Sequence, residues 1–393
     1  QIPLLYGKML KANNKVDKAK EVFVVYASKN PNSKNAESEA TSCDKVKLWA
    51  DQTPKRYEIK LAKDINSKLS DFSPSNYEKG LVFVSERNVD NIENSAYSLT
   101  GRPFLAIYQA EQSGEDTFFK PKLFPSNINN DYHNGPIAFN GNFNEGFLTR
   151  VDVFAKGKEF VNKPQLYYLK REKEKWQDPV PYEHNNAEYA LAHPTLSPDG
   201  KMLFFVSDMP GGNGGKDIYL SKQQEGAWSK PENLGPLVNT DGDEMFPYYS
   251  KDGTLYFSSD GHMGYGGMDI FSAKFIADRW GTVKNLKEPM NSSKDDFGIM
   301  FTNDSIGFLS SNRPGGKGSD DIYRFKIIYD KEIHSSITGI FLFSKLNPAA
   351  DVYLKLLDEN NVEVQRVKTN KYGEFFFENL KLDATTDDCI IIN

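Results

Sequence analysis

A pattern that recurs every 52 residues constrains the fold of this chain more than any other feature. Ser207, Ser259 and Ser311 each lie near the end of a short apolar run, and consecutive members are 52 residues apart. Three aspartates keep the same interval, and each is followed by Ile and an aromatic residue: Asp217, Asp269 and Asp321. Self-similarity of this kind predicts an array of one small supersecondary unit, stacked against copies of itself.

Each copy of the repeat is predicted to contain four short antiparallel strands. A turn precedes each apolar run, at 197–200, 250–253 and 302–305, and Asp-Gly in the first two supplies the positive φ of a tight hairpin. A Gly-rich loop then leads to the Asp-Ile-aromatic strand, and Trp228 or Trp280 precedes the fourth strand. Four antiparallel strands in roughly 40–50 residues are typical of one β-propeller blade.

Two weaker copies precede the three clear ones. In the first, 71–74 and 80–86 are interpreted as the same turn and strand as 197–208. The second contains apolar runs at 135–139 and 146–149. The innermost strands are therefore expected to start near residues 72, 135, 192, 245 and 296. The sequence predicts a five-bladed propeller.

The ring is expected to close with a strand from its N-terminal side. After Arg324 the chain leaves the repeat, so the last blade has no fourth strand of its own. Residues 57–61 have the character of a strand, and pairing them with the last blade would remove an open sheet edge. The propeller then covers residues 56–329. A sixth blade would need further strands within 87–103 or 151–164.

The blade motif carries a family resemblance. Residues 197–208, Ser-Pro-Asp-Gly-Lys-Met-Leu-Phe-Phe-Val-Ser-Asp, resemble the PD40 (WD40-like, TolB-type) propeller repeat. The resemblance implies the fold. Its functional implication is a binding platform, although such propellers sometimes accompany enzymes.

The segment before the propeller, residues 1–55, is predicted to be helical. Gly7, Ala19, Phe23 and Pro31 occupy the small, small, aromatic and terminating positions of a tetratricopeptide (TPR) repeat, which this segment resembles. One such repeat is marginal alone, because stacked neighbours supply its core. We therefore expect either that the helices pack on the propeller or that further repeats precede the first residue.

The segment after the propeller, residues 335–393, is predicted to be a small Greek-key β-sandwich. Its run at 369–380, Thr-Asn-Lys-Tyr-Gly-Glu-Phe-Phe-Phe-Glu-Asn-Leu, resembles the signature of the carboxypeptidase-regulatory-like domain. Asn370 stands where that signature has Asp. Because residues 390–393 resemble the penultimate strand of the domain, we expect this sandwich to be truncated. The whole chain is thus expected to be mainly β with an N-terminal α segment.

The order of the three segments is similar to that of PorE-type envelope proteins of the type IX secretion system. The resemblance implies a periplasmic protein associated with the outer membrane, with β-barrel and lipoprotein components of a secretion complex as partners. In that family an OmpA-like domain follows the sandwich and binds peptidoglycan. That domain lies outside this sequence, so peptidoglycan binding is assigned to no residue here.

Composition excludes several other classes of function. The net charge of −6 argues against nucleic-acid binding, which needs a basic face. The sequence contains no run of about 18 apolar residues that would span a membrane as a helix, and no targeting signal is visible at Gln1. Cys43 and Cys389 form neither a metal-binding nor a redox spacing.

Candidate chemical groups fall at repeated positions, which favours structural roles. The acidic groups at 241–244 and 295–296 precede innermost strands and could form a glycosidase pair in the channel, but 130–131 occupies the equivalent loop two blades earlier. His133 and His193 also each precede an innermost strand, where a metal pair is the alternative to hydrogen bonding between strands. The Gly-rich loop at 208–217 could hold Ca²⁺, but Asp capping its own turn is the favoured interpretation. We therefore predict no catalytic residue, cofactor or metal, and no enzyme.

Binding surfaces are the better candidates. The segments 87–102 and 151–164 interrupt the two weakest blades and are predicted to contact a partner. Three aromatic residues at loop tips are predicted to be anchors for a partner: Tyr97, Phe160 and Tyr265. Three hypotheses follow: an envelope scaffold, a glycan-binding or hydrolytic enzyme that uses the propeller channel, and a ligand sensor. A flat exposed apolar patch would favour the scaffold, and a deep asymmetric channel site would favour the sensor.

Overall fold

The computed structural model describes residues 2–31, 33–52, 57–87, 101–125, 127–151, 163–276, 279–328, 334–344, 347–357, 363–381 and 391–392. Within these ranges no helix has the length and apolar character needed to cross a membrane. The chain divides into two compact units, one comprising Gln1–Ala273 with Thr282–Ile327 and the other Lys274–Gly281 with Ile328–Asn393.

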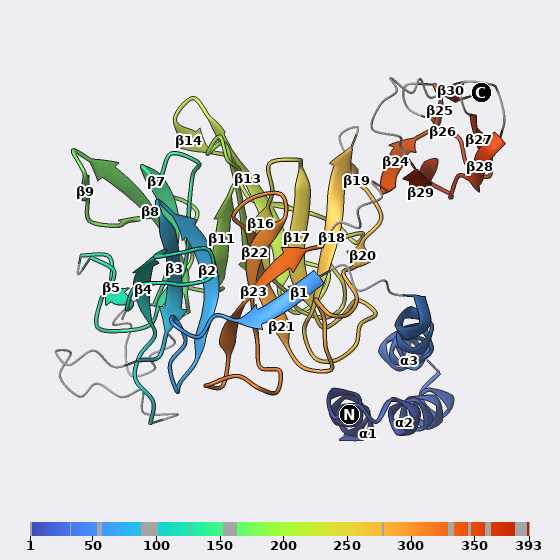
Figure 1. Ribbon diagram of the computed structural model, residues 1–393, viewed down its shortest axis with the longest axis horizontal. Helices are drawn as coiled ribbons and strands as arrows, with labels where there is room; N and C mark the ends of the chain where they lie inside the picture. The colour runs from blue at the N-terminus through green and yellow to red at the C-terminus, as the bar shows by residue number, and fades with distance from the viewer. Residues whose placement is uncertain are drawn as a thin grey trace. The chain divides into compact units, whose positions relative to one another are not determined.

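Five antiparallel four-stranded blades form the propeller of the first unit, which confirms the predicted number (Figure 1). Blade 1 is β2 (Asp71–Tyr77), β3 (Gly80–Ser85), β4 (Ala106–Glu111) and β5 (Lys122–Leu123). Blade 2 is β6 (Asn134–Phe139), β7 (Glu145–Arg150), β8 (Gln165–Glu172) and β10 (Val180–Pro181). Blade 3 is β11 (Leu191–Leu196), β12 (Met202–Ser207), β13 (Asp217–Gln224) and β15 (Glu232–Asn233). Blade 4 is β16 (Glu244–Tyr249), β17 (Thr254–Ser259), β18 (Asp269–Ile276) and β20 (Lys284–Asn285).

Blade 5 joins the two ends of the propeller. It contains β21 (Asp296–Phe301), β22 (Ile306–Ser311), β23 (Asp321–Ile327) and, as its outermost strand, β1 (Tyr57–Leu61). β1 pairs antiparallel with β23, with Tyr57 opposite Ile327 and Leu61 opposite Tyr323. The strand expected to close the ring therefore covers the outer edge of the last blade. Short hairpins extend three third strands through β9 (Lys175–Trp176), β14 (Ala227–Trp228) and β19 (Arg279–Trp280).

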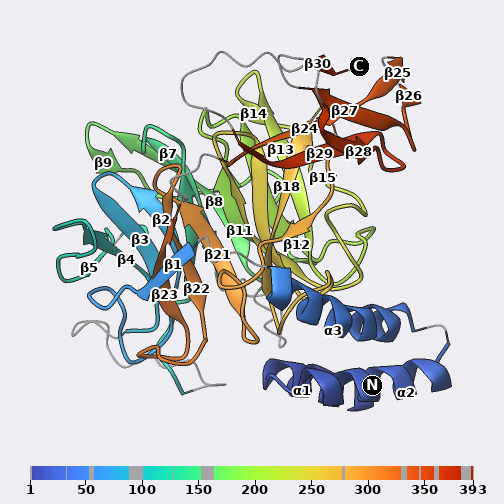
Figure 2. The same cartoon turned by 45° about the vertical axis from the view of Figure 1, so that its right-hand side comes forward.

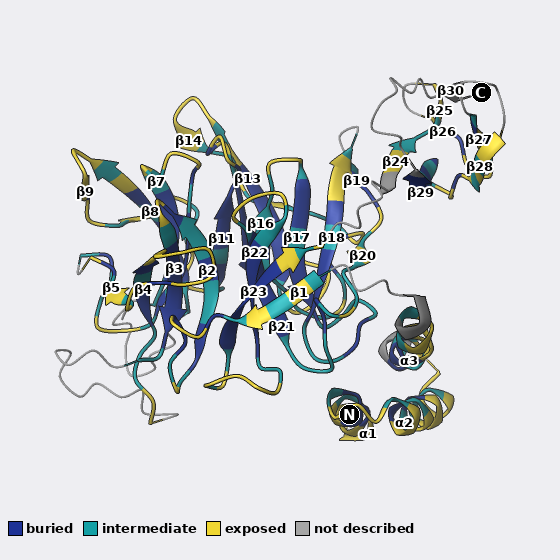
Figure 3. Cartoon of the chain, viewed as in Figure 1, coloured by how far each residue is buried: buried dark blue, intermediate teal, exposed yellow. Residues whose placement is uncertain are grey.

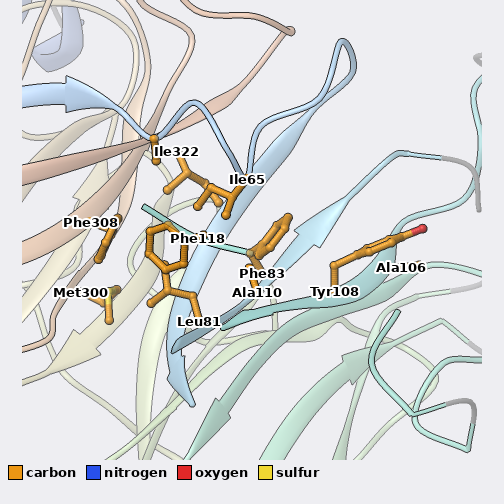
Figure 4. Packing of buried hydrophobic residues seen from close by; sticks show 11 residues of the cluster. Ile65, Leu81, Phe83, Ala106, Tyr108, Ala110, Phe118, Met300, Phe308 and Ile322 are labelled. Carbon is orange, nitrogen blue, oxygen red and sulfur yellow. The ribbon is translucent and has the colours of Figure 1, made fainter. Parts of the chain in front are cut away.

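Many residues of the propeller strands are buried (Figure 3). Apolar clusters between neighbouring blades hold the ring together. Between blades 1 and 5, Leu81 and Phe83 of β3 belong to the same buried cluster as Phe308 and Ile322 (Figure 4). Burying one such side chain contributes about 1.5–3 kcal/mol. The apolar runs found in the sequence are therefore the contact surfaces between blades.

A two-residue bulge interrupts every innermost strand near the propeller axis. The first bulge residue has positive φ in each case: Ser73 (52°), Gly135 (99°), His193 (51°), Phe246 (52°) and Gly298 (59°). In four of the five blades the second bulge residue is proline, which has no N–H to leave unpaired. This corrects the interpretation of 71–74 as a turn, because Ser73 and Pro74 lie inside β2 and the hairpin turn follows at Glu78 (φ 48°).

An asparagine clamp recurs in all five blades. In blade 4, Asn291 Oδ1 accepts the N–H of Ile270 (2.7 Å) and its Nδ2 donates to the Ile270 carbonyl (2.9 Å). The same pair of bonds joins Asn66 to Ile322, Asn129 to Ile107, Asn185 to Leu166 and Asn239 to Ile218. Each clamp ties the loop that enters the next blade to the third strand of the blade before it.

Three helices precede the propeller: α1 (Ile2–Ala12), α2 (Val16–Lys29) and α3 (Lys34–Gln52), with α2 packed against both others (Figure 2). α1 and α2 approach closely, since a Cβ at Gly7 would lie 2.3 Å from the Phe23 ring. The buried ammonium of Lys11 donates to Glu39 (2.7 Å) and Ser42 (3.0 Å) between α1 and α3.

α3 also contacts the propeller at a Gly-rich loop, through Gly264 and Tyr265. The hydroxyl of Ser42 donates to the Gly264 carbonyl (2.7 Å) and accepts the Gly264 N–H (3.0 Å). Lys8 of α1 lies 3.4 Å from Asp260 in the same loop. The helices therefore pack on the loop between β17 and β18.

The second unit contains the C-terminal strands in three small sheets. β24 (His334–Ile340) pairs with β29 (Glu374–Lys381), β25 (Leu342–Ser344) pairs with β26 (Asn347–Pro348), and β27 (Tyr353–Leu357) lies between β28 (Glu363–Lys368) and β30 (Ile391–Ile392). Leu354, Phe375 and Phe377 belong to its core. Asn370 Oδ1 accepts the N–H groups of Tyr372 (2.9 Å) and Glu374 (3.1 Å), so the amide side chain stabilises the turn.

Candidate functional site

The central channel narrows where the bulges of the innermost strands meet. The cavity there has a volume of about 40 Å³, and its walls include Pro74, Pro136, Pro194 and Pro247. This is room for a few water molecules only. The backbone of blade 1 is tied to blade 5 here, because the Ser73 N–H donates to Ser310 Oγ of blade 5 (2.9 Å).

Aromatic rings pack beside the bulges around this narrow part of the channel. The His193 ring stacks on Phe246 with centroids 4.0 Å apart, and Phe246 lies 4.8 Å from Phe297. His193 Nδ1 faces the Phe246 N–H (3.4 Å), and burial, with a smaller effect of Lys216, lowers the pKa of this imidazole to about 3. His193 is therefore a neutral, partly buried packing residue of the channel.

His133, the other histidine considered for a metal pair, lies elsewhere. Its Nδ1 accepts the N–H of Leu105 (3.2 Å), and its ring contacts the edge of Phe104 at 4.9 Å. Burial lowers its pKa. It does not line the channel cavity beside His193. Among the described residues, no group of three His, Cys, Asp or Glu side chains is placed to hold a metal ion.

The carboxylates at the starts of the innermost strands are engaged in the fold. Glu244 is fully buried and accepts hydrogen bonds from the Thr240 N–H (2.7 Å), Thr240 Oγ1 (2.6 Å) and Ser259 Oγ (2.6 Å). Burial raises its pKa to about 7, against the opposing effect of these bonds. Asp296 accepts the Ser292 N–H (2.6 Å) and pairs with Arg313 (2.5 Å). Each caps the loop before its own strand.

The neighbouring acidic residues serve the same loops. Asp243 accepts the backbone N–H of Lys216 (2.9 Å) and pairs with its ammonium (2.7 Å). Asp295, at the equivalent position of the next blade, accepts the Met268 N–H (2.9 Å) and an amide N–H of Asn312 (2.7 Å). Asp243 and Asp295 therefore each join adjacent blades. The acidic groups at 243–244 and 295–296 do not face each other across the channel.

The Gly-rich loops wrap around the aspartates that end them. Asp321 Oδ2 accepts the N–H groups of Lys317 (2.7 Å) and Gly318 (2.9 Å), and Asp217 Oδ2 accepts the N–H of Asn213. A Cβ at Gly264 would lie 1.9 Å from Asp269 Oδ2, so glycine is required for this close approach. The loops present N–H donors to the carboxylate, as expected for a capped turn, whereas Ca²⁺ needs oxygen ligands.

The residues proposed as partner anchors have different outcomes. Tyr97 and Phe160 lie outside the described residues, as do most of the segments 87–102 and 151–164. Tyr265 is only 3% exposed, and its ring lies 5.5 Å from that of Trp49 in α3. This corrects the expectation of an exposed aromatic tip, because Tyr265 contacts the chain's own helix.

The other end of the channel opens into a wide funnel that the sequence patterns did not reveal. Its volume is about 750 Å³, and the hairpin turns between the first and second strands of all five blades contribute to its walls. Aromatic residues from blades 2, 4 and 5 line it: Phe139, Phe143, Tyr248, Tyr249 and Phe301. Among its charged residues are Lys79, Lys251, Glu78 and Glu115. A single sequence gave no signal for this site, because its residues come from turns that only ring closure brings together.

Comparisons with known proteins give distant likenesses only. No family model matches the sequence, and no curated protein matches it. Among solved structures, TolB from Acinetobacter baumannii is 16% identical over 67% of this chain and 55% of that chain, with a TM-score of 0.35. A putative TolB from Agrobacterium tumefaciens is 13% identical over 64% and 72%, with a TM-score of 0.32. The arabinanase Arb43A from Bacillus subtilis is 12% identical over 68% and 97%, with a TM-score of 0.41.

These similar structures carry no argument about what this chain does, because their scores are low and they include both TolB proteins and an enzyme. The chain spans about half the length of the first of them. The five-bladed propeller rests on the strand pairings themselves.

Proposed function

We propose that this chain is a non-catalytic scaffold of the bacterial cell envelope, in the periplasm beside the outer membrane, and a component of a type IX secretion complex. The support is the order of its parts: helices with a tetratricopeptide-like pattern, a PD40-like propeller and a carboxypeptidase-regulatory-like segment. All three kinds of module serve interaction. The proposed partners are β-barrel and lipoprotein components of that complex.

An exposed apolar stripe on α1 carries the proposal. Ile2 (83% exposed), Leu5 (61%), Tyr6 (55%) and Met9 (57%) follow the i, i+3, i+4, i+7 spacing of one helix face. The opposite face of α1 is already used, since Gly7 and Lys11 are buried. Contiguous exposed apolar side chains of this kind mark interaction surfaces. An apolar protein surface is the partner chemistry that fits them.

The alternative of a channel enzyme has less support. A glycosidase needs two carboxylates that face one substrate. Asp243, Glu244, Asp295 and Asp296 are each engaged by backbone or side-chain donors, and none of them lines the channel cavity or the funnel. The same residues have a complete structural role without any substrate.

The test is affinity capture from solubilised envelopes with the tagged chain, read by mass spectrometry. We expect the wild-type chain to recover outer-membrane barrel and secretion proteins, and the double variant Leu5→Asp, Met9→Asp to lose at least about tenfold of them, because charge on the stripe opposes apolar contact. Val180→Asp is the matched control, since Val180 is 57% exposed on β10, and it should capture as the wild type does.

Equal capture by the stripe variant and the wild type would show that α1 is not the contact. Recovery of background proteins only by the wild type would contradict the scaffold function. Circular dichroism of both variants confirms that a loss of capture is not a loss of folding.

A further inference from the structure

The funnel has the size and shape of a small-molecule site. Its volume of about 750 Å³ lies within the roughly 300–1,000 Å³ of known ligand pockets. Beyond it the channel narrows to about 40 Å³ at the bulges, so an occupant enters from the mouth and stops there. The funnel therefore suits a compact molecule and not a chain that threads the propeller.

Hydrogen bonds within the protein already occupy several polar side chains of the funnel. Asn76 donates to the Phe301 carbonyl (2.7 Å), Gln112 to the Glu115 carbonyl (3.0 Å) and Thr302 to the Ile306 carbonyl (3.0 Å). Asn140 donates to Asn144 (2.7 Å). Each of these side chains has a donor engaged within the protein, which leaves fewer donors for the many hydroxyls of a neutral saccharide.

The aromatic residues offer apolar surface from different blades. Phe139 packs against Tyr77 at 4.9 Å and Trp176 at 5.3 Å, which holds its ring in place on the blade 2 side. In blades 4 and 5, Tyr248 lies 6.1 Å from Phe301. Phe139, Tyr248 and Phe301 are all partly exposed in the funnel, so an apolar body can lie against rings already held by their neighbours.

The charges of the funnel favour an anion. Glu78 is paired with Arg171 at 2.6 Å, and Glu115 lies 3.7 Å from Arg324 and 3.8 Å from Lys326. The ammonium groups of Lys79 and Lys251 form no ion pair with any described residue, and both side chains are exposed. Each of these two acidic groups thus lies within 4 Å of a basic group of the protein, although Arg324 also pairs with Asp116 (2.9 Å), whereas two cations from blades 1 and 4 are available to a ligand.

We propose that the funnel binds a small amphipathic carboxylate, whose apolar body lies against the aromatic side chains and whose carboxylate reaches Lys79 or Lys251. This site is independent of the α1 stripe, which is on a different element.

Isothermal titration calorimetry with two matched probes tests the site: 1-naphthoate and the neutral 1-naphthamide. We expect the wild-type chain to bind 1-naphthoate about tenfold more tightly than 1-naphthamide, because only the anion gains charge-assisted hydrogen bonds. The double variant Lys79→Gln, Lys251→Gln should bind both probes with equal, weak affinity. Lys230→Gln, an exposed lysine outside the funnel lining, should match the wild type.

Three results would overturn the proposal: no binding of either probe, equal binding of both by the wild type, or an unchanged preference for the anion in the double variant. Tighter binding of a neutral disaccharide such as maltose than of 1-naphthoate would also overturn it, in favour of a glycan site. None of these outcomes depends on capture of an envelope partner, so this test and that of the scaffold function fail separately.

Discussion

The two ends of the propeller channel are built from the same five strands but differ in how their polar groups are used. At the end where the innermost strands begin, buried carboxylates and amides form hydrogen bonds within and between blades, and α3 packs on the adjoining loop of blade 4. At the other end the hairpin turns surround an open funnel with two lysines that form no ion pair with any residue the structure describes. Acidic residues near a propeller axis are therefore not by themselves evidence of catalysis.

The largest difference between the ends should appear in folding stability. Asn291→Ala removes both bonds of a buried clamp and leaves the N–H and carbonyl of Ile270 without these partners, which should cost about 2–4 kcal/mol of unfolding free energy. Asn76→Ala, at the funnel end, removes one bond of a partly exposed side chain and should cost about 1 kcal/mol or less. Urea unfolding of both variants measures the two losses of unfolding free energy. Equal losses would contradict the claim that the polar groups at the two ends are used differently.

The clamps show what the sequence could and could not predict. Asn239 and Asn291 are 52 residues apart, in step with the repeat, so a signal was present. The role of these two asparagines could not be predicted, because each bonds a backbone about 21 residues earlier, in the preceding blade. The other copies are also unevenly spaced, at Asn66, Asn129 and Asn185. The 52-residue repeat and its two weaker copies predicted the number of blades and the starts of the innermost strands to within about one residue, because each copy carries the same local strand and turn pattern.

The bulges and the funnel could not be predicted from the sequence repeat. A proline follows the first bulge residue in four blades, yet Ser73-Pro74 was interpreted as a turn because Ser-Pro also begins the true turn at Ser197. The two positions differ in strand register, which the local sequence does not reveal. Tyr265 resembled an exposed loop tip for a similar reason, since nothing in its own loop reveals the helix that covers it.

A second difference between the ends should appear as pH dependence. Burial raises the pKa of Glu244 to about 7, above its ordinary value of 4.5. The folded state therefore holds this proton more tightly than the unfolded state does, so the stabilising contribution is present below pH 4.5 and is lost as the pH rises through 7. The full effect is at most about 3 kcal/mol.

Glu244→Gln removes this titration while keeping a side chain of similar size. We expect the unfolding free energy of the variant to fall less than that of the wild type between pH 4.5 and pH 8, measured by urea unfolding at fixed ionic strength. Parallel pH profiles for the two proteins would show that Glu244 is ionised in the folded state at low pH, contrary to its burial.

Amide hydrogen exchange compares the two ends most directly within one molecule. We expect the N–H groups of the funnel turns, such as those of Lys79 and Lys251, to exchange within seconds to minutes. The clamped N–H groups should exchange only on global unfolding: those of Ile107, Leu166, Ile218, Ile270 and Ile322. The clamped amides could instead exchange as fast as those of the funnel turns. That result would contradict the claim that the polar residues at the end where the innermost strands begin serve the fold and not a reaction.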